Sequence, residues 1–368
     1  MNAPAFPSTQ VIESSTTLWG AALQPAGCPQ CRQAHLVEAP RLGQPCPNCA
    51  RGQLASQPAS LRPEPPELLA PFQKSRQDAH QALATFAGEV WIRPDDMDAD
   101  KMLQRAVPVY WPMWLVDSDM AGSWQAEAGF DYQVKSSQES YTGSGWSTRD
   151  VVETRIRWEP RLGQVNRHYD NVAVPATTDH KQLAGQVGAF QLARAGAYDP
   201  GQVTGAALRV PDLPPESAWP LAQTNLDKAA GDECRQAAGA QHFRNFSLRA
   251  SYENLHWTQL LLPLYATYYT DDNGQRHPVY INGQTGAIGG LRLASQRKGW
   301  RWAGIILAVA AAVFVLALLI SSLGLVFPPA AIVGVIVGIV AVAMACAAIV
   351  PAAWPWQWNR RQPGASAK

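Results

Sequence analysis

The sequence predicts a multidomain protein with three parts: a small four-cysteine ribbon, an α+β domain with antiparallel strands, and a C-terminal hairpin of two transmembrane helices. Three observations lead to this prediction. Two Cys-x-x-Cys pairs lie near the N-terminus, residues 302–355 include no charged side chain, and strand-like apolar runs alternate with helical patterns between these two regions. The 368 residues are enough for one to three domains.

The first 26 residues have neither a basic segment nor an apolar core, so they do not resemble a secretory signal peptide. We predict that residues 1–26 form a disordered tail that stays in the reducing cytoplasm. Disulfides are rare in that compartment.

A ribbon is predicted over residues 27–51. Its two Cys-Pro-x-Cys pairs are separated by 14 residues and comprise Cys28, Cys31, Cys46 and Cys49. Each pair can form one tight turn, and two turns complete a tetrahedron of thiolates around zinc. Since the protein then fills all four positions, this pattern predicts one structural Zn²⁺ per chain and so a small zinc ribbon.

Two alternatives exist for these cysteines. Redox dithiols belong with a thioredoxin-like βαβ pattern, which is missing here, and a disulfide framework is disfavoured in the cytoplasm. His35 could replace one thiolate, although a solvated loop residue is the simpler interpretation.

A flexible linker is predicted over residues 52–70, because 52–66 are rich in Pro, Ser, Ala and Gln. Between 32 and 62 there are four arginines and one acid, a net charge of 4 − 1 = +3; the residues are Arg32, Glu38, Arg41, Arg51 and Arg62. This mild excess gives nucleic-acid binding only weak support, and the chain as a whole carries +1.

Residues 71–296 are predicted to form a cytoplasmic α+β domain. Helices are expected over 75–86, 179–190 and 219–237, and strands over 107–116, 123–133, 151–158, 165–172, 243–251, 258–269, 277–281 and 287–293. The polar segment 136–150 is expected to be a mobile hairpin tip. The two strand groups are similar in order, which predicts a duplicated helix-plus-sheet unit.

No motif for nucleophilic, phosphate-binding or metalloprotease chemistry occurs in this domain. Asp117 and Asp119 could be a carboxylate pair, but at a predicted strand end they are expected to form a turn. His168, Tyr169 and Asp170 are adjacent, and neighbours on a strand point to opposite faces. We therefore predict no catalytic residue and no enzymatic activity.

The C-terminal region is predicted to cross a membrane twice, with helices over 302–327 and 330–350 and a cytoplasmic tail over 351–368. About 20 apolar residues span a bilayer, and the Pro328-Pro329 pair separates the two stretches. Basic residues lie at both outer ends: Arg297, Lys298, Arg301, Arg360, Arg361 and Lys368. By the positive-inside rule, both termini face the cytoplasm. Five tryptophans, at 300, 302, 354, 356 and 358, are expected to form the interfacial belt.

Small residues recur every four positions in both apolar stretches, a spacing that lets helices approach closely. The residues are Gly304, Ala308, Ala312, Ala330, Gly334 and Gly338. They are predicted to pack the hairpin against itself or to form a homo-oligomer. The stretches hold no ionisable residue, which argues against a transporter or channel.

The order of these motifs resembles a group of bacterial membrane proteins with an N-terminal transcription-factor-type zinc ribbon. The resemblance covers most of residues 27–350 and includes PVYWPMWLVDSD, HYDNVAVPA, LLPLYATYY and, most specifically, NGQTG at 282–286. Some of these proteins carry the name of a primosomal helicase, but no helicase motor motif is present here. The resemblance implies an architecture of ribbon, cytoplasmic α+β domain and anchor in the bacterial inner membrane.

These features predict a non-enzymatic, membrane-anchored adaptor that docks a cytoplasmic protein or assembly at the inner membrane. Contractile injection machines offer an analogy of layout. A membrane-tethered nucleic-acid-binding protein and an enzyme with an unrecognised site in the middle domain are the two alternatives.

Overall fold

The computed structural model describes residues 6–13, 17–143 and 145–362. They form two compact units. The first, here called the sheet unit, contains Gln10–Pro112, Asp179–Val210 and Leu261–Lys368; the second, the arm unit, contains Met1–Thr9, Met113–Thr178 and Pro211–Leu260. Two long strands contribute residues to both units.

The sheet has the strand order β13-β12-β11-β7-β10-β3-β2-β4, and almost all neighbours with a known register are antiparallel. The exception is the parallel pair β10–β7. The shorter strands are β1 Gln10–Ile12, β2 Gln24–Gly27, β3 Ala34–Val37, β4 Ala55–Ser56, β5 Ala59–Leu61, β6 Leu68–Leu69, β9 Gly196–Ala197, β10 Ala207–Arg209, β12 Arg276–Asn282 and β13 Ile288–Gly290. The prediction of a sheet-rich domain with antiparallel strands is confirmed.

Helices α1 (Arg76–Gly88), α2 (Ala99–Gln104) and α3 (His180–Val187) belong to the sheet unit. The start of α1 is fixed by a capping box, in which Ser75 Oγ accepts from the Asp78 amide and the Asp78 carboxylate accepts from the Ser75 amide. Leu83 and Phe86 of α1 pack with Tyr269 in one of the hydrophobic clusters of this unit. The predicted helix over 75–86 is therefore present.

The predicted tail and linker differ from the structure. Within 17–26, Leu23 is buried and β2 is part of the sheet, while residues 1–5 and 14–16 lie outside the described residues. Across 52–70, strands β4, β5 and β6 form, and Leu61 and Leu69 pack into the same cluster as Leu36 of β3. Scattered leucines among prolines are enough to attach this segment, so the ribbon is part of the sheet and not a tethered tip.

The arm unit is built on three long strands, β7 (Val107–Thr142), β8 (Gly145–Pro175) and β11 (His242–Thr270), with helix α4 (Pro215–Ala238) packed along β8. Trp114, Val174 and Trp257 form its core together with Ala218 and Ala222 of α4. The prediction of several short strands was wrong at three places: 107–133, 151–172 and 243–269 each lie within one continuous strand.

The segment Asp117-Ser118-Asp119 does not end a strand. A register shift between Val116 and Ser118 accommodates it as a bulge, and Asp117 Oδ1 accepts the Asn171 amide at 2.6 Å. Asn171 has φ +54°, a left-handed conformation that asparagine tolerates. The polar turn signal in the sequence therefore corresponds to a bend within a strand.

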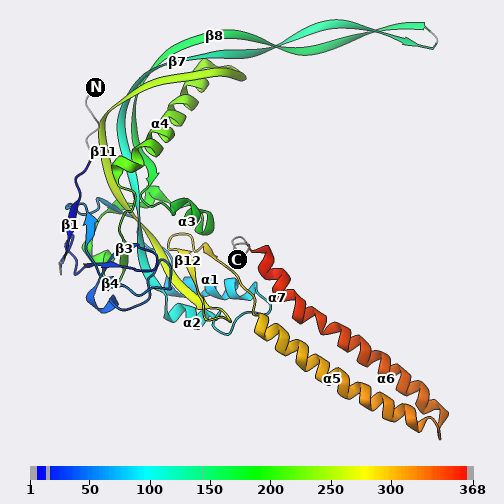
Figure 1. Cartoon of the computed structure of the whole chain (residues 1–368). Coiled ribbons are helices and arrows are strands. Elements are labelled where there is room, and N and C mark those ends of the chain that lie inside the picture. The colour runs from blue at the N-terminus through cyan, green and yellow to red at the C-terminus, as the bar shows by residue number, and fades with distance from the viewer. Residues whose placement is uncertain (1–5, 14–16, 144, 363–368) are drawn as a thin grey trace. The chain divides into compact units, whose positions relative to one another are not determined.

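Beyond this region, β7 and β8 continue alone as a two-stranded ribbon (Figure 1). The register runs without a break from Ser118 opposite Tyr169 to Thr142 opposite Gly145. β11 begins at His242, whose Nε2 lies 2.8 Å from Asp131 Oδ1, so residues 131–157 are named here the outer arm. From Asp131 to Thr142 this arm is about 40 Å long at roughly 3.4 Å per residue.

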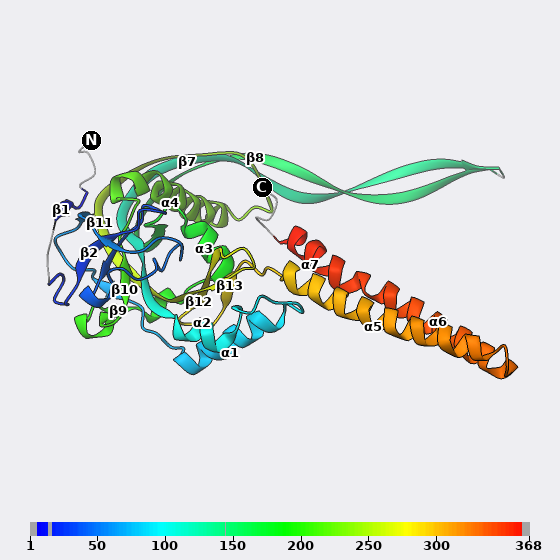
Figure 2. The ribbon, with the colours of Figure 1, turned by 60° about the horizontal axis from the view of Figure 1, so that its bottom comes forward.

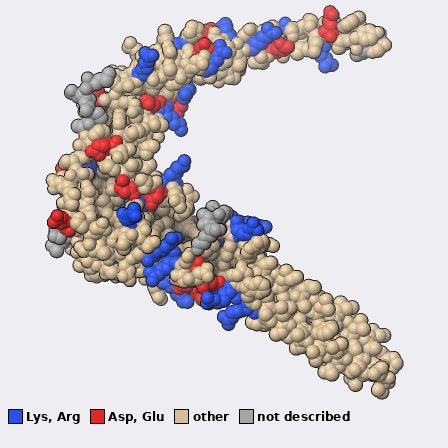
Figure 3. Space-filling view, in the orientation of Figure 1, with Lys and Arg blue, Asp and Glu red and all other residues tan. Residues whose placement is uncertain are grey.

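Three helices follow the last strand: α5 (Gln296–Leu323), α6 (Pro328–Ala347) and α7 (Ile349–Arg361). α5 runs alongside α6 and α7 as an antiparallel pair (Figure 2). Two candidate spans, Gln296–Leu323 and Pro328–Arg361, are long and apolar enough to cross a membrane. The visible surface of this hairpin carries no charged side chain, whereas Lys and Arg gather near its base (Figure 3).

The residues that pack the hairpin are only partly those predicted. Gly334 is buried and Gly338 and Ala330 are half-buried, but Gly304, Ala308 and Ala312 are exposed. The contact face of α5 instead consists of residues spaced by seven: Ala303, Ala310 and Ala317. An all-apolar helix gives no amphipathic signal to distinguish its faces, and several small-residue spacings coexist on α5.

Two of the predicted belt tryptophans have another role. Trp354 stacks on Trp358 at 5.1 Å, and both pack against the buried cluster of α1 and β12. Trp358 Nε1 donates to the Arg292 carbonyl at 2.7 Å. α7 is therefore fixed to the sheet unit, while Trp300, Trp302 and Trp356 stay exposed.

We expect Gly334→Leu to destabilise the hairpin strongly. A Cβ at this position would lie 2.1 Å from Ser321 Oγ and 2.7 Å from the Ser321 amide nitrogen, so α5 and α6 would have to separate. Overpacking of this kind costs about 1–3 kcal/mol. Gly304→Leu is the matched control, since nothing lies within 4 Å of its Cβ position. Thermal unfolding of the full chain in detergent measures the effect, and equal midpoints for the two variants would refute this packing.

Candidate metal centre

The four predicted cysteines lie together. Their Sγ atoms are all within 4.8 Å of one another, and they could hold a metal ion. Cys28 Sγ is 3.7 Å from Cys49 Sγ, and Cys31 Sγ is 3.7 Å from Cys46 Sγ. These separations are far longer than the about 2.05 Å of a disulfide. The cysteines are free thiols, and each close pair joins one Cys-x-x-Cys turn to the other.

The two turns have the same local geometry. The Arg32 amide donates to the Cys28 carbonyl, and the Ala50 amide donates to the Cys46 carbonyl, each at 2.8 Å. The residue after each second cysteine has positive φ, +60° at Arg32 and +59° at Ala50. This repeated turn points both sulfurs of a pair to the same side, as a shared metal requires.

Gly52 allows the two turns to approach. A Cβ there would lie 2.4 Å from Cys28 Sγ, so any side chain would displace a ligand sulfur. The backbone amide of Asn48 donates to Cys46 Sγ within the second turn, at a distance of 3.4 Å. Sulfur ligands in metal sites commonly accept such amide hydrogen bonds, which orient them.

Side chains remote in sequence hold the second turn in place. The Tyr280 hydroxyl donates to the Asn48 carbonyl, and Arg276 Nη1 donates to the Ala50 carbonyl at 3.2 Å. Arg209 is buried, with its guanidinium 3.9 Å from the Trp111 ring centroid and its Nη1 2.8 Å from Asp179 Oδ2. Arg209 Nη1 also donates to Asn48 Oδ1 at 3.4 Å, so the second turn is linked to β10 and, through Arg209, to the start of α3, while Tyr280 and Arg276 link it to β12.

His35 is not the solvated loop residue that the sequence indicated. It lies on β3 opposite Arg209, it is 1% exposed, and its Nε2 is 3.6 Å from Cys46 Sγ. Burial, reinforced by the charge of Arg209, lowers the pKa of His35 to about 3. The imidazole is therefore neutral at physiological pH and touches one ligand sulfur.

Four thiolates this close together would repel one another if no cation were bound, so the sulfurs of the metal-free cluster share protons through hydrogen bonds. Hydrogen bonds to the Cys31 and Cys49 sulfurs, together with burial, raise the pKa of Cys46. Hydrogen bonds from Cys31 and Cys46 lower the pKa of Cys49. In the metal-free cluster a proton is therefore held more tightly on Cys46 than on Cys49, and a cation would compete with the protons of the thiols.

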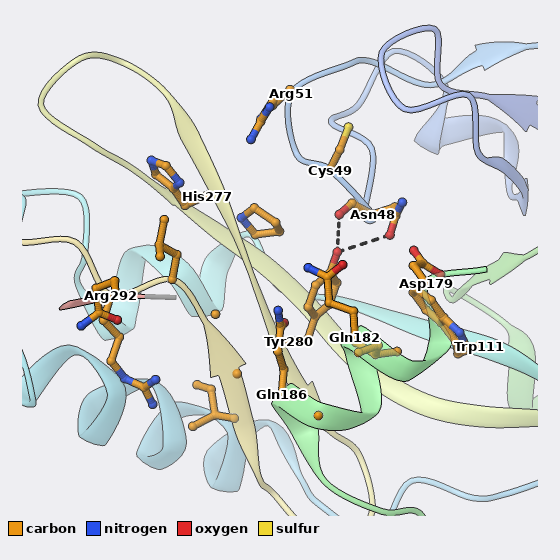
Figure 4. Close-up of a pocket in the computed structure, with 18 residues that line it drawn as sticks. Asn48, Cys49, Arg51, Trp111, Asp179, Gln182, Gln186, His277, Tyr280 and Arg292 are labelled. Carbon is orange, nitrogen blue, oxygen red and sulfur yellow. Dashed lines mark hydrogen bonds between the residues drawn. The ribbon is translucent and has the colours of Figure 1, made fainter. Parts of the chain in front are cut away.

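A cavity of about 680 Å³ opens beside the second turn (Figure 4). Its wall includes Cys49, Trp111, Asp179, Tyr280 and Gln186 of α3. Among the described lining residues, Asp179 is the one carboxylate, and it is paired with Arg209. The one histidine of the described lining, His277, is paired with Asp271, its Nε2 3.0 Å from Asp271 Oδ2.

The other residues weighed for chemistry lie on open surface of the arm unit. Asp119 and His168 are paired across β7 and β8 with Nδ1 2.6 Å from Oδ1, and His168 Nε2 is 2.8 Å from Asp170 Oδ1. The hydrogen bond to Asp119 raises the pKa of His168. Tyr169 points to the other face and is buried. His168, Asp119 and Asp170 are solvent-exposed and form a surface ion-pair network.

Two of the four arginines that supported nucleic-acid binding are engaged within the protein. Arg41 Nη2 donates to the Gly205 carbonyl at 2.7 Å, and Arg62 pairs with Glu67 at 2.7 Å. These two guanidinium groups are correspondingly less available to a nucleic acid.

Sequence analysis missed the residues that attach the cluster to the sheet. Arg209, Trp111 and Tyr280 lie 60 or more residues from the cysteines, and single residues of these types carry no positional signal. A weak clue was available, since Arg209 lies within the apolar run AALRV. Comparison with models of known families, with curated proteins and with solved structures found no match to this chain.

We expect the purified chain to hold one metal ion, and Cys49→Ser to lose it. Because loss of even a second-shell partner lowers metal affinity about 10–100-fold, loss of a ligand should cost more. Elemental analysis of the full chain measures the metal content. Cys346→Ser is the control, since Cys346 lies in α6 outside the cluster. Equal metal content in the two variants would contradict the site.

Metal affinity should fall as the pH is lowered. The raised pKa of Cys46 means that the metal-free cluster binds a proton that the metal-bound cluster lacks, so binding is favoured at high pH and lost towards acid. Each proton released changes affinity about ten-fold per pH unit. Competition with a chromophoric chelator between pH 8 and pH 6 measures this slope, and a flat profile would show that no proton is exchanged.

Proposed function

We propose that the four-cysteine cluster is a structural zinc site. Four thiolates at about 2.3 Å from one ion in a tetrahedron lie about 3.8 Å apart. The 3.7 Å separations of both close sulfur pairs fit this value. With four protein ligands there is no open coordination position, so the ion supplies folding energy and no Lewis-acid chemistry.

The hairpin of α5 and α6 anchors the protein in the bacterial inner membrane, with both termini in the cytoplasm. Its support is the uncharged stretch between Arg301 and Arg360, together with the basic residues at both outer ends. Trp300, Trp302 and Trp356 are exposed near those ends, where indoles favour the membrane interface.

The anchored protein acts as an adaptor, and the outer arm is the element that docks a cytoplasmic protein or assembly. The observation that carries this proposal is that almost every described side chain of residues 131–157 is exposed, on both faces of the ribbon. An isolated two-stranded ribbon is only marginally stable in water. A segment of this length that buries neither face is therefore suited to being covered by a partner.

The arm carries the side chains that protein interfaces use most. Tyr141 is 65% exposed and Trp146 is 74% exposed, and their rings meet near the tip at 5.4 Å. Trp and Tyr are the residues most enriched among binding hot spots. The four acids and four bases of the arm cancel, which favours a protein surface over a nucleic-acid backbone; they are Asp131, Lys135, Glu139, Arg149, Asp150, Glu153, Arg155 and Arg157.

We expect Tyr141→Ala with Trp146→Ala to abolish partner recovery. The pair should contribute at least about 2 kcal/mol to binding, or about 30-fold in affinity. Tyr132→Ala is the matched control, because it also removes an exposed aromatic ring but lies opposite Arg155 on the other face of the arm. Both variants should fold normally, since exposed substitutions usually change stability by less than about 0.5 kcal/mol.

A shortened arm gives a second test. Ser136 is paired with Val151, so residues 137–150 can be replaced by Asn-Gly, which forms a tight two-residue turn. Quantitative co-purification from cross-linked native membranes compares this variant with the intact chain. If every protein recovered with the intact chain is recovered equally with the shortened one, the arm is not the docking element.

A further inference from the structure

A groove of about 740 Å³ lies between α5 and the α6–α7 segment, at the base of the hairpin. Its size is in the range of ligand sites, about 300–1,000 Å³. Alanines from all three helices line it, among them Ala303, Ala345 and Ala352, and so do the indoles of Trp300 and Trp356. Small side chains thus leave a channel along the helices where larger ones would fill it.

Both indoles are largely exposed, Trp300 at 63% and Trp356 at 54%. They stand at the level where the uncharged stretch meets the basic ends of the hairpin. The groove therefore runs from the membrane interface into the apolar part of the hairpin, where Leu307 lines it.

Cations lie at the outer end of the groove, which is the end away from Leu307 and beyond the uncharged stretch. The Arg360 guanidinium lies 4.7 Å from the Trp356 ring centroid. Arg297 lines a smaller polar cavity that shares Gln296 and Trp300 with the groove. One arginine from each side of the hairpin is thereby placed beside an indole of the groove.

Carboxylates do not neutralise this end. The Asp272 carboxylate lines the same polar cavity, where it accepts from Ser295 Oγ and the Arg297 amide, and Lys298 is paired with Asp95 at 2.6 Å. Asp271 lines the same cavity and is paired with His277 at 3.0 Å. Among the described residues at the base, five cations therefore face three acids, an excess of 5 − 3 = +2; the cations are Arg297, Lys298, Arg301, Arg360 and Arg361.

We propose that this groove binds an anionic phospholipid, with an acyl chain along the alanines and the phosphate at the Arg297 and Arg360 end. The inference rests on the membrane insertion given under the proposed function and is independent of the arm. An occupant must be apolar along Ala303 and Ala345 and anionic at the outer end, and a lipid of the surrounding leaflet satisfies both conditions. A second copy of the chain would bring the same cations to the same level, where they would repel.

Native mass spectrometry of the intact chain in detergent tests the proposal, with phosphatidylglycerol and phosphatidylcholine as the probes. We expect selective retention of phosphatidylglycerol by the unmodified chain. Arg360→Gln should weaken that retention about five-fold, the effect of one arginine near an anionic lipid surface. Arg361→Gln removes the same charge from the next residue, which does not stack on a groove indole, and should change it less than two-fold.

The apolar part of the groove has its own pair of variants. Ala352→Leu fills the groove and should reduce retention of phosphatidylglycerol, whereas Ala343→Leu, on an exposed face of α6 outside the groove, should not. If Ala352→Leu fails to fold, as judged by circular dichroism and metal content, the two arginine variants still decide the question.

Equal retention of the two lipids, or equal effects of the two arginine variants, would overturn the proposal. Conversion of a dimer to a monomer by Ala352→Leu would also overturn it, because the groove would then be a helix interface between two copies of the chain. Extraction of native membranes with alkaline carbonate distinguishes a failure of membrane anchoring from a failure of the lipid site. Release of the chain by carbonate would refute membrane anchoring itself. A chain that stays in the membrane but shows no lipid preference would refute only the lipid site.

Discussion

A two-stranded β-ribbon that buries neither face gains little from the hydrophobic effect, so it is only marginally stable until another surface covers it. The described residues of 131–157 form such a ribbon, with β-pairing along its whole register but almost no buried side chain. Charged side chains on this ribbon limit edge-to-edge aggregation. Glu153 pairs with Arg155, and Arg157 pairs with Glu159, which lies just beyond the outer arm. Aromatic residues at its tip then give it a surface that a partner can cover.

The other compact unit of the chain carries the cysteine cluster and the helical hairpin. In the sheet unit, the cysteine cluster joins β2, β3 and the turn at Asn48, and Tyr280 and Arg276 hold that turn against the sheet. At the other end of the same unit, α7 is packed through Trp354 and Trp358, and Asn359 exchanges two hydrogen bonds with the backbone of Ala294. The cysteine cluster and the hairpin are thus parts of one compact unit, and the segment 52–70 packs into that unit where the sequence predicted a flexible linker.

Sequence reasoning succeeded where the physical signal is local. The spacing of the four cysteines predicted that they lie together, the pattern over 75–86 predicted α1, and uniform apolarity predicted the helical hairpin. It failed where the signal is distributed or missing. Leu61 and Leu69 are separated by prolines and charges, so their attachment to the core is not periodic, and Arg209 reaches the cluster from another part of the chain. The outer arm has no apolar alternation because neither face is buried, so its polar residues resembled a loop.

Amide hydrogen exchange of residues 136–151 tests the central claim most directly. In the purified chain in detergent, these amides should exchange rapidly, since an uncovered two-stranded ribbon opens easily. In native membranes that retain their associated proteins, the same amides should be protected, while exchange of the buried strand β12 should be equal in both preparations. Equal exchange of 136–151 in the two preparations would show that nothing covers the arm and would contradict the adaptor function.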